Sequence, residues 1–279
     1  MYSDPILSFT LFGKEFGVYL YGVCIAVGIL AAFAFLYLIG KKRGVSEEMF
    51  DFIFYNGIVA IVIGFLGATL YQAFYNYLKN PAGGFQFGSG MTFIGGLIFG
   101  AASFLIGYFL VRKRMKSRLI DVECIFPSCI LLAHGFGRIG CFFAGCCYGA
   151  DAKGAFAFLG VSFPEYSLAN YHGGEMFYDG TPVYPTMLFE AAFLFILFGV
   201  CTFLLLKKNF RLTFPVYLIS YAVFRFLIEY VRGDERGKFI LPFLSPSQFQ
   251  SVLMLGLGIA LIFVLPKFYE KRAAELETK

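Results

Sequence analysis

The sequence has no tryptophan, only two histidines and few charged residues. Charged residues make up 15% of its 279 residues, whereas a soluble domain has roughly 25%. Hydrophobic residues make up 59%, which excludes an ordinary soluble domain and predicts a polytopic membrane protein. Since tryptophan is absent, the aromatic belts at the membrane interfaces must come from the 18 tyrosines. The net charge of +5 is too small for the continuous basic face that nucleic acids need, so we expect no nucleic-acid partner.

Seven apolar segments are each near or above the roughly 20 residues that cross a bilayer as a helix. They lie at about residues 16–40, 50–78, 91–111, 119–138, 185–206, 212–231 and 247–266. The first 15 residues have no basic start and no small-residue cleavage site, so we expect no cleaved signal peptide. The sequence therefore predicts an all-α integral membrane protein that forms one membrane domain over residues 1–279.

Basic residues predict the orientation of these spans. Four clusters in alternate connections and in the C-terminal tail hold 15 of the 23 lysines and arginines. They are Lys41, Lys42 and Arg43; Arg112, Lys113, Arg114, Lys116 and Arg118; Lys207, Lys208 and Arg211; and Lys267, Lys271, Arg272 and Lys279. The positive-inside rule then places the N-terminus outside and the C-terminus in the cytoplasm. The long connection over about residues 141–184 falls outside, and we expect it to be ordered.

The stretch from His134 to Gly149 has an unusual composition for an apolar span. A histidine and an arginine, His134 and Arg138, lie four residues apart among glycines and three cysteines. Such polar residues near hydrocarbon are costly and mark a site by default. The glycines allow the backbone to approach a ligand or the helix to end in a tight turn. We interpret this stretch as the part that holds the phosphate of a lipid.

Two further spans carry charged residues inside apolar sequence. Arg225 and Glu229 are four residues apart in the sixth span and share one helix face. They form either a structural ion pair or an arginine aimed at an anionic ligand. Arg138 at the same predicted depth favours the second interpretation, because arginine suits bidentate contact with phosphate oxygens. Glu190 in the fifth span either reaches toward the surface, bonds to a neighbouring helix, or acts as an orienter or proton acceptor in the site.

Six polar residues from five spans map to the outer half of the predicted bilayer, and their convergence predicts one cavity that opens outward. They are Tyr21, Arg138, Glu190, Arg225, Glu229 and Gln248. Tyr21 alone would read as an interfacial tyrosine, and Gln248 as a hydrogen-bond donor to a headgroup. Gly96 and Gly100 have the four-residue spacing that lets membrane helices pack closely.

The three cysteines Cys141, Cys146 and Cys147 leave several interpretations open. Their spacing lacks the paired C-x2-C of structural zinc sites, and a metal would need His134 or His172 as further ligands, so we expect no metal. A disulfide would use Cys141 or a more distant partner, because adjacent cysteines do not easily pair. A nucleophilic thiol beside Arg138 is a third interpretation, since a nearby cation lowers a thiol pKa. We favour structural thiols, buried or disulfide-linked.

At these residues the chain resembles the prolipoprotein diacylglyceryl transferases over nearly its whole length. The resemblance is carried by short pieces in five spans and the long loop. They are Tyr21-Gly22, Phe93-x-Gly95-Gly96, Gly137-Arg138-Ile-Gly140-x-Phe142, Gly145 with Gly149, Pro185-x4-Glu190 and Phe224-Arg225-x3-Glu229. It implies a multi-pass protein of the bacterial cytoplasmic (inner) membrane without metal or organic cofactor. Its implied partners are phosphatidylglycerol and the lipobox segment of a prolipoprotein signal peptide.

The resemblance implies transfer of the diacylglyceryl group to the lipobox cysteine at the outer face, with release of glycerol phosphate. The implied catalytic residues are Arg138, Arg225 and Glu229, and we add His134. The implied substrate-binding residues are Tyr21, Gly95, Gly96, Gly140, Cys141, Gly145, Gly149, Glu190 and Gln248.

The chain departs from the family pattern at several polar positions. A histidine usually precedes the third-span Gly-Gly, where this chain has Ile94, and Asn usually follows Gly-Arg-x-Gly, where it has Cys141. The following Asn-Gly-Glu is Ala144-Gly145-Cys146 here. We therefore hypothesise that His134 supplies the base; the alternative is a histidine that packs between helices. A paralogue with another acceptor and a non-catalytic lipid-binding or transport protein remain alternatives.

Overall fold

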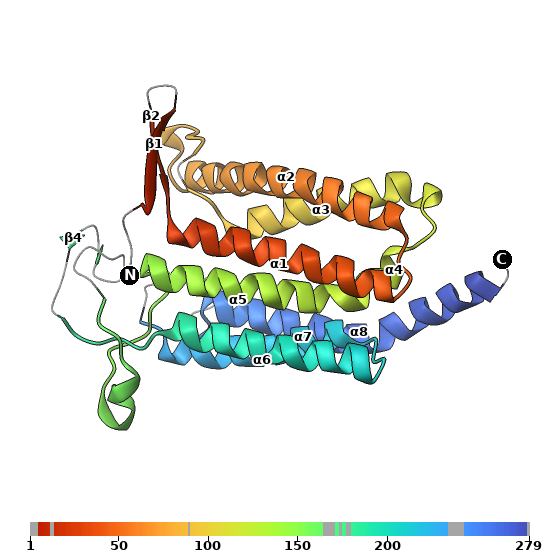
Figure 1. The fold of residues 1–279 in the computed structure, drawn as a ribbon. Helices are drawn as coiled ribbons and strands as arrows, with labels where there is room; N and C mark the ends of the chain where they lie inside the picture. Colours follow the sequence, from red (N-terminus) through yellow and green to blue (C-terminus); the bar gives the residue numbers. More distant parts are fainter. Residues whose placement is uncertain are drawn as a thin grey trace. The chain divides into compact units, whose positions relative to one another are not determined.

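The computed structural model describes residues 5–11, 14–88, 90–163, 171–172, 175–176, 180–233 and 243–277. Within these ranges the chain is dominated by helices (Figure 1). Seven helical segments are long and apolar enough to cross a membrane, as expected. The side chain of His172, considered as a metal ligand, and Lys279 of the basic tail lie outside what is described.

The helices are α1 (Leu20–Lys42), α2 (Glu47–Lys79), α3 (Phe93–Val111), α4 (Leu119–Val122), α5 (Phe126–Ala144), α6 (Thr186–Lys207), α7 (Thr213–Ile228) and α8 (Pro246–Glu277). Short 3-10 turns include η3 (Glu123–Ile125), which joins α4 to α5, η4 (Gly154–Leu159), and η6 (Glu229–Val231), which continues α7. Strands β1 (Leu7–Leu11) and β2 (Lys14–Val18) form an antiparallel hairpin before α1, and β3 (Tyr171–His172) pairs with β4 (Glu175–Met176).

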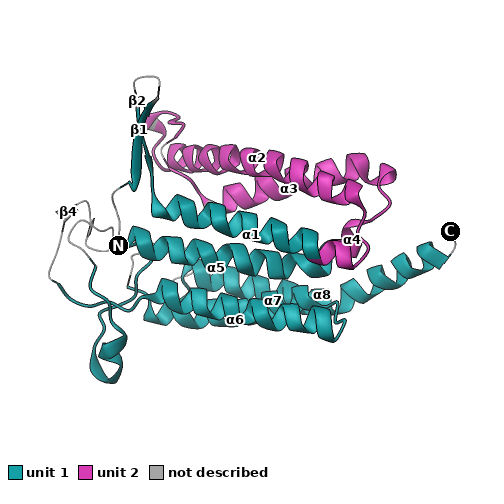
Figure 2. Ribbon diagram, in the orientation of Figure 1, with its two compact units in different colours: residues 1–38, 123–279 teal, residues 39–122 magenta. Residues whose placement is uncertain are grey.

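The chain divides into two compact units, residues 39–122 and residues 1–38 with 123–279, which are coloured separately in Figure 2. In the first of these, α2 and α3 pack through glycines. A Cβ on Gly95 would lie 2.9 Å from the carbonyl oxygen of Gly67, and one on Gly100 would lie 3.2 Å from that of Ala60. Gly96, whose Cβ would lie 3.5 Å from the oxygen of Gly64, and Gly100 both face α2, so the close packing predicted for this pair in the third span is found.

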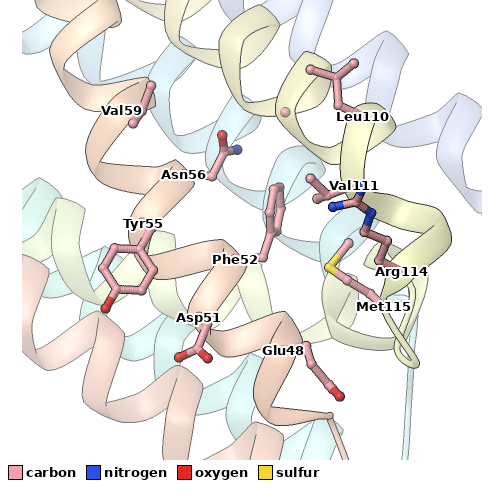
Figure 3. Close-up of a pocket in the computed structure, with 11 residues that line it drawn as sticks. Glu48, Asp51, Phe52, Tyr55, Asn56, Val59, Leu110, Val111, Arg114 and Met115 are labelled. Atoms are coloured by element: carbon pink, nitrogen blue, oxygen red, sulfur yellow. The ribbon is translucent and has the colours of Figure 1, made fainter.

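The same unit contains a cavity of about 560 Å³ between the N-terminal half of α2 and the C-terminal end of α3. Figure 3 shows Val59 and Leu110 at one end of this cavity and Glu48 and Asp51 at the other. Its lining is mostly apolar, and Glu48 also pairs at 3.9 Å with Lys116. The charged groups sit at helix ends, where their ionised heads can remain hydrated.

The larger unit packs α5, α6, α7 and α8 side by side (Figure 1). Its core joins Leu131 of α5, Leu194 of α6, and Tyr217 and Tyr221 of α7. Helix α1 packs against α5 at Gly28. A side chain at this position would not fit, because its Cβ would lie 2.9 Å from Phe136 Cβ. This arrangement places the polar residues of α5, α6 and α7 on neighbouring helices.

Helix α5 runs through Ala144, so the connection after it begins at residue 145 rather than at 141 as expected. The described part of this connection is ordered by backbone bonds. The amide of Gly149 donates to the oxygen of Tyr184 at 2.7 Å, and that of Ala150 donates to Val231 at 2.8 Å. These bonds tie the residues after α5 to the start of α6 and the end of α7. The orientation of the spans and the single membrane domain stay predictions.

Candidate active site

Arg138 on α5 is held by a histidine of its own helix and a carboxylate of the next. Its Nη2 lies 3.1 Å from Glu190 Oε1, and its Nε donates to His134 Nε2 at 3.3 Å. The i,i+4 spacing puts His134 and Arg138 on one face of α5, as the sequence predicts. Since His134 Nε2 accepts this bond, the imidazole is neutral in this arrangement. The same nitrogen lies 3.8 Å from Glu190 Oε1.

Glu190 on α6 is the most deeply buried charged residue of the site, with none of its surface exposed. Its Oε1 accepts a hydrogen bond from the Tyr221 hydroxyl at 2.7 Å and also faces Arg138. Within the described residues, its other oxygen, Oε2, is buried without a hydrogen-bond partner. A buried oxygen without a partner is costly and calls for an explanation such as a ligand or an ordered water. Glu190 thus bonds to neighbouring helices rather than reaching for the surface.

Arg225 on α7 has a different set of partners. Its Nη1 donates to Glu229 Oε2 at 2.8 Å, and its Nη2 donates to Ser247 Oγ on α8 at 2.7 Å. The ion pair expected from the i,i+4 spacing is therefore present. Glu229 Oε1 accepts a further bond from Ser245 Oγ at 2.7 Å, so both of its oxygens are engaged.

Ser245 and Gln248 begin α8 with a reciprocal pair of bonds. The Gln248 amide donates to Ser245 Oγ at 3.1 Å, and the Ser245 amide donates to Gln248 Oε1 at 3.0 Å. This is a capping box, which satisfies two backbone donors that a helix start leaves open. Gln248, predicted to bind a headgroup, therefore uses its side-chain oxygen and its backbone N–H in the cap. The side-chain nitrogen Nε2 is the atom that a headgroup would contact.

Helix α7 carries residues that bond to both glutamates of the site. Tyr221 bonds to Glu190, the partner of Arg138, and Arg225 bonds to Glu229. Both guanidinium groups act electrostatically on Tyr221 and on His134. The His134 and Tyr221 rings lie edge to face, with centroids 5.3 Å apart. Tyr21 on α1 is within electrostatic range of Arg138. Contacts join Arg138 to Glu190, and join Arg225 to Glu229 and through Ser245 to Gln248. That these residues converge with Tyr21 on one cavity stays a prediction.

The three glycines predicted on and after α5 have distinct local roles. A Cβ on Gly140 would lie 3.1 Å from the Tyr21 ring, so this glycine lets α1 approach α5 beside Arg138. Gly145 ends α5 in the left-handed conformation at φ 67°, which only glycine adopts without strain. A Cβ on Gly149 would lie 2.8 Å from the oxygens of Tyr184 and Val231. All three shape the backbone around the arginines, and contact with substrate stays a prediction.

Gly95 and Gly96 of α3 belong to the other unit, where a Cβ would meet α2. For Gly95 the nearest atom is Tyr71 Cβ at 2.5 Å, and for Gly96 it is Ala68 Cβ at 3.5 Å. Packing therefore explains Gly95, whereas a Cβ on Gly96 would make only an ordinary contact. Their substrate-binding role stays a prediction implied by the resemblance alone.

The cysteines Cys141, Cys146 and Cys147 are free thiols that gather at the end of α5. Hydrogen bonds from the Cys141 and Cys146 thiols lower the pKa of Cys147, and Arg232 lowers it further. Cys141 is buried against Phe163 and Met187. Cys141 thus lies in the wall of the site, and its predicted contact with substrate stays untested.

Two serines of the site, Ser245 and Ser247, are absent from the sequence-based prediction. Ser245 could have been found, because Ser-x-x-Gln before an apolar run is a capping signature. Ser247 carries no such signal, since its bond to Arg225 depends on how α7 and α8 pack. Tyr221 lies four residues before Arg225 on α7, but its bond to Glu190 on α6 joins separate helices and has no signal in the sequence.

Comparison with known proteins gives one consistent result. The family model described as prolipoprotein diacylglyceryl transferase matches residues 8–264. The phosphatidylglycerol–prolipoprotein diacylglyceryl transferase of Clostridium tetani is 36% identical over 273 residues, which cover 95% of this chain and 98% of the relative. Transferase 2 of Clostridium perfringens is 34% identical, covering 89% and 92%. The Staphylococcus carnosus enzyme is 32% identical, covering 94% and 90%.

Proposed function

The chain belongs to the prolipoprotein diacylglyceryl transferase family, and from that premise we propose how its buried arginines perform the transfer. The enzyme moves the diacylglyceryl group of phosphatidylglycerol to the cysteine thiol of a prolipoprotein. A sulfur–carbon bond forms while the bond between that carbon and a phosphate oxygen breaks. Glycerol phosphate leaves with the electron pair, so negative charge grows on the phosphate oxygens.

Arg138 and Arg225 are the groups that stabilise this charge. Both are nearly buried, and each is oriented by a carboxylate, Glu190 at 3.1 Å and Glu229 at 2.8 Å. Preformed donors in a site without water stabilise developing charge most strongly, because they need no reorganisation during the reaction. The single observation that carries the proposal is that Tyr221, whose hydroxyl donates to Glu190 at 2.7 Å, lies four residues before Arg225 and so on the same face of α7.

The incoming thiol must lose its proton, and His134 is the proposed acceptor. Its Nε2 accepts a bond from Arg138 at 3.3 Å, so this lone pair is occupied before substrate binds. A phosphate that takes the donors of Arg138 would release it. Once protonated, the imidazolium would face Glu190, which already lies 3.8 Å away. Phosphate binding and base activation would then be coupled through Arg138.

The remaining assignments follow the family resemblance. We place the reaction at the outer face of the bacterial cytoplasmic membrane, with the connection after α5 on that side and the C-terminus inside. The acceptor is the lipobox segment of the signal peptide. Tyr21, Gly140 and Gln248 line the path of the lipid, and the resemblance alone assigns Gly95 and Gly96 to substrate binding.

A transfer assay tests the activity directly. The purified enzyme is given labelled phosphatidylglycerol and a lipobox peptide, and peptide lipidation and glycerol phosphate release are measured together. We expect both in equal amounts, and a Cys→Ser lipobox peptide is the control that receives nothing. Binding without turnover would support the lipid-binding alternative instead, and turnover only with other acceptors would support a paralogue.

The role of His134 has its own test. We expect His134→Gln to lose about a hundredfold or more in the rate at saturating phosphatidylglycerol, which is the usual range for a general base. Phe136→Leu, a neighbouring α5 variant that leaves the polar network in place, is the control. A His134→Ala enzyme with full lipidation activity would exclude the base assignment.

A further inference from the structure

Three cysteines meet where α5 ends. The sulfur atoms of Cys141, Cys146 and Cys147 all lie within 4.8 Å of one another. We propose that these thiols bind a soft divalent cation such as Zn²⁺. The bound ion would link the end of α5 to the connection that follows it. This departs from the sequence-based expectation of no metal, which rested on the absence of a C-x2-C spacing.

The turn after α5 explains how an irregular spacing can bring three sulfurs together. Gly145 reverses the chain at φ 67°, and Cys147 is itself left-handed at φ 62°. The Cys146 amide then donates to the oxygen of Cys141 at 3.1 Å, and the Cys146 thiol contacts the same oxygen at 3.7 Å. Thr186 Oγ1 at the start of α6 holds the oxygen of Cys147 at 2.8 Å. The turn is thus fixed at both ends with its thiols facing one another.

The donor set selects the class of cation. Three sulfurs suit zinc and other soft ions, whereas Mg²⁺ and Ca²⁺ require oxygen ligands. Zinc–sulfur bonds of about 2.3 Å in a tetrahedron put sulfurs about 3.8 Å apart, so each pair would need to close by no more than about 1 Å. Among the described residues, no histidine or carboxylate belongs to this group, so water or an added ligand would complete the tetrahedron.

Charge favours a divalent ion over a monovalent one. Three thiolates with Zn²⁺ carry a net charge of −1, and with Cu⁺ they carry −2. The Arg232 guanidinium interacts electrostatically with Cys147 and supplies positive charge, part of which its pairing with Glu229 at 4.0 Å offsets. Its side chain is only 2% exposed, so this charge is poorly screened by water. A divalent ion therefore leaves the cluster close to neutral.

Metal binding is tested on the full chain in detergent after reduction and removal of the reductant. Co²⁺ alone is titrated first, because thiolate-to-cobalt charge-transfer absorption reports sulfur ligands, and Zn²⁺ is then used to displace it. We expect one Co²⁺ per chain. Cys146→Ala and Cys147→Ala should each weaken Zn²⁺ binding more than about a hundredfold. Cys201→Ala in α6, which removes a thiol outside the cluster, should bind as the parent does.

A second measurement needs no variant. Zn²⁺ should slow maleimide labelling of Cys146 and Cys147 at least tenfold, while labelling of Cys24, which is similarly half-buried, stays unchanged. Equal labelling of Cys146 and Cys147 with and without Zn²⁺ would overturn the proposal. So would unchanged Zn²⁺ affinity in both alanine variants, or a disulfide within the cluster whose reduction yields no Co²⁺ charge-transfer band. None of these readouts depends on lipid transfer. Failure of the metal proposal can therefore be told apart from failure of the proposed enzymatic function.

Discussion

Arg225 is buried, the Arg138 side chain is 17% exposed, and each is paired with a glutamate, but the groups around them differ. Arg225, Glu229, Ser245 and Ser247 form a network in which both carboxylate oxygens are engaged. Around Arg138, the carboxylate of Glu190 keeps a buried oxygen without a partner among the described residues. Both carboxylate oxygens are therefore hydrogen-bonded or paired in the first network, and only one is in the second. We therefore expect Arg225 to be a fixed phosphate donor and Arg138 to be the one that changes partners during the reaction.

Removing Arg138 should have the largest effect. Arg138→Gln takes away a donor to the leaving phosphate and leaves Glu190 buried without its cation. We expect transfer to fall about a thousandfold and the free energy of unfolding to fall by about 3–5 kcal/mol. The transfer rate and thermal unfolding in detergent measure the two effects.

The double variant Arg138→Gln with Glu190→Gln is the matched control for that prediction. Removing both charges should restore much of the lost stability without restoring transfer. An Arg138→Gln enzyme that retains more than a tenth of the parent rate would contradict the proposal that Arg138 is the arginine that changes partners during the reaction.

Glu229→Gln should have an intermediate effect. Arg225 would keep its bond to Ser247 and could still donate to the new amide oxygen, so its orientation is weakened rather than lost. We expect transfer to fall by about a hundredfold, within the range for a weakened transition-state donor. Kinetics at varied phosphatidylglycerol concentration check this. A loss equal to that of Arg138→Gln would mean that the two networks are equally sensitive.

Tyr221→Phe should have a smaller effect, because it removes one donor and no charge. The hydroxyl donates to Glu190 at 2.7 Å, and a hydrogen bond to a charged group is worth about 1.5–3 kcal/mol. We expect a lower unfolding temperature and a transfer rate reduced by about tenfold. Tyr217→Phe, one turn earlier on α7, is the control. Equal rates for Tyr221→Phe and the parent enzyme would contradict a role for this tyrosine between the networks.

Ser245→Ala should have the smallest effect on transfer. It removes the cap of α8, worth about 1 kcal/mol, and one of three groups that contact Glu229, the others being Arg225 and Arg232. We expect a lower unfolding temperature with transfer reduced less than about threefold. Ser245→Thr, which can still cap, should restore the temperature. A loss of transfer as large as that of Tyr221→Phe would show that the Arg225 network is not complete by itself.

The parts of this site that lie on one helix could be predicted from the sequence, and those that join helices could not. Arg225 with Glu229, and His134 with Arg138, follow from four-residue spacing. The pairing of Arg138 with Glu190 depends on how α5 packs on α6, and no periodicity encodes it. The seven spans follow from length and hydropathy. The cysteine cluster arises from a left-handed turn at Gly145 and Cys147, and ligand-spacing rules for regular zinc sites did not anticipate it.

The central claim is that Arg138 and Arg225 bind one phosphate, and a double-variant cycle tests it most directly. The inhibition constant of glycerol phosphate is measured for the parent enzyme, Arg138→Lys, Arg225→Lys and the double variant. Groups that share one ligand show coupling of about 0.5–3 kcal/mol, whereas independent groups add within about 0.3–0.5 kcal/mol. We predict that the double variant loses less affinity than the sum of the two single losses by at least about 1 kcal/mol. Strictly additive losses would contradict a shared phosphate.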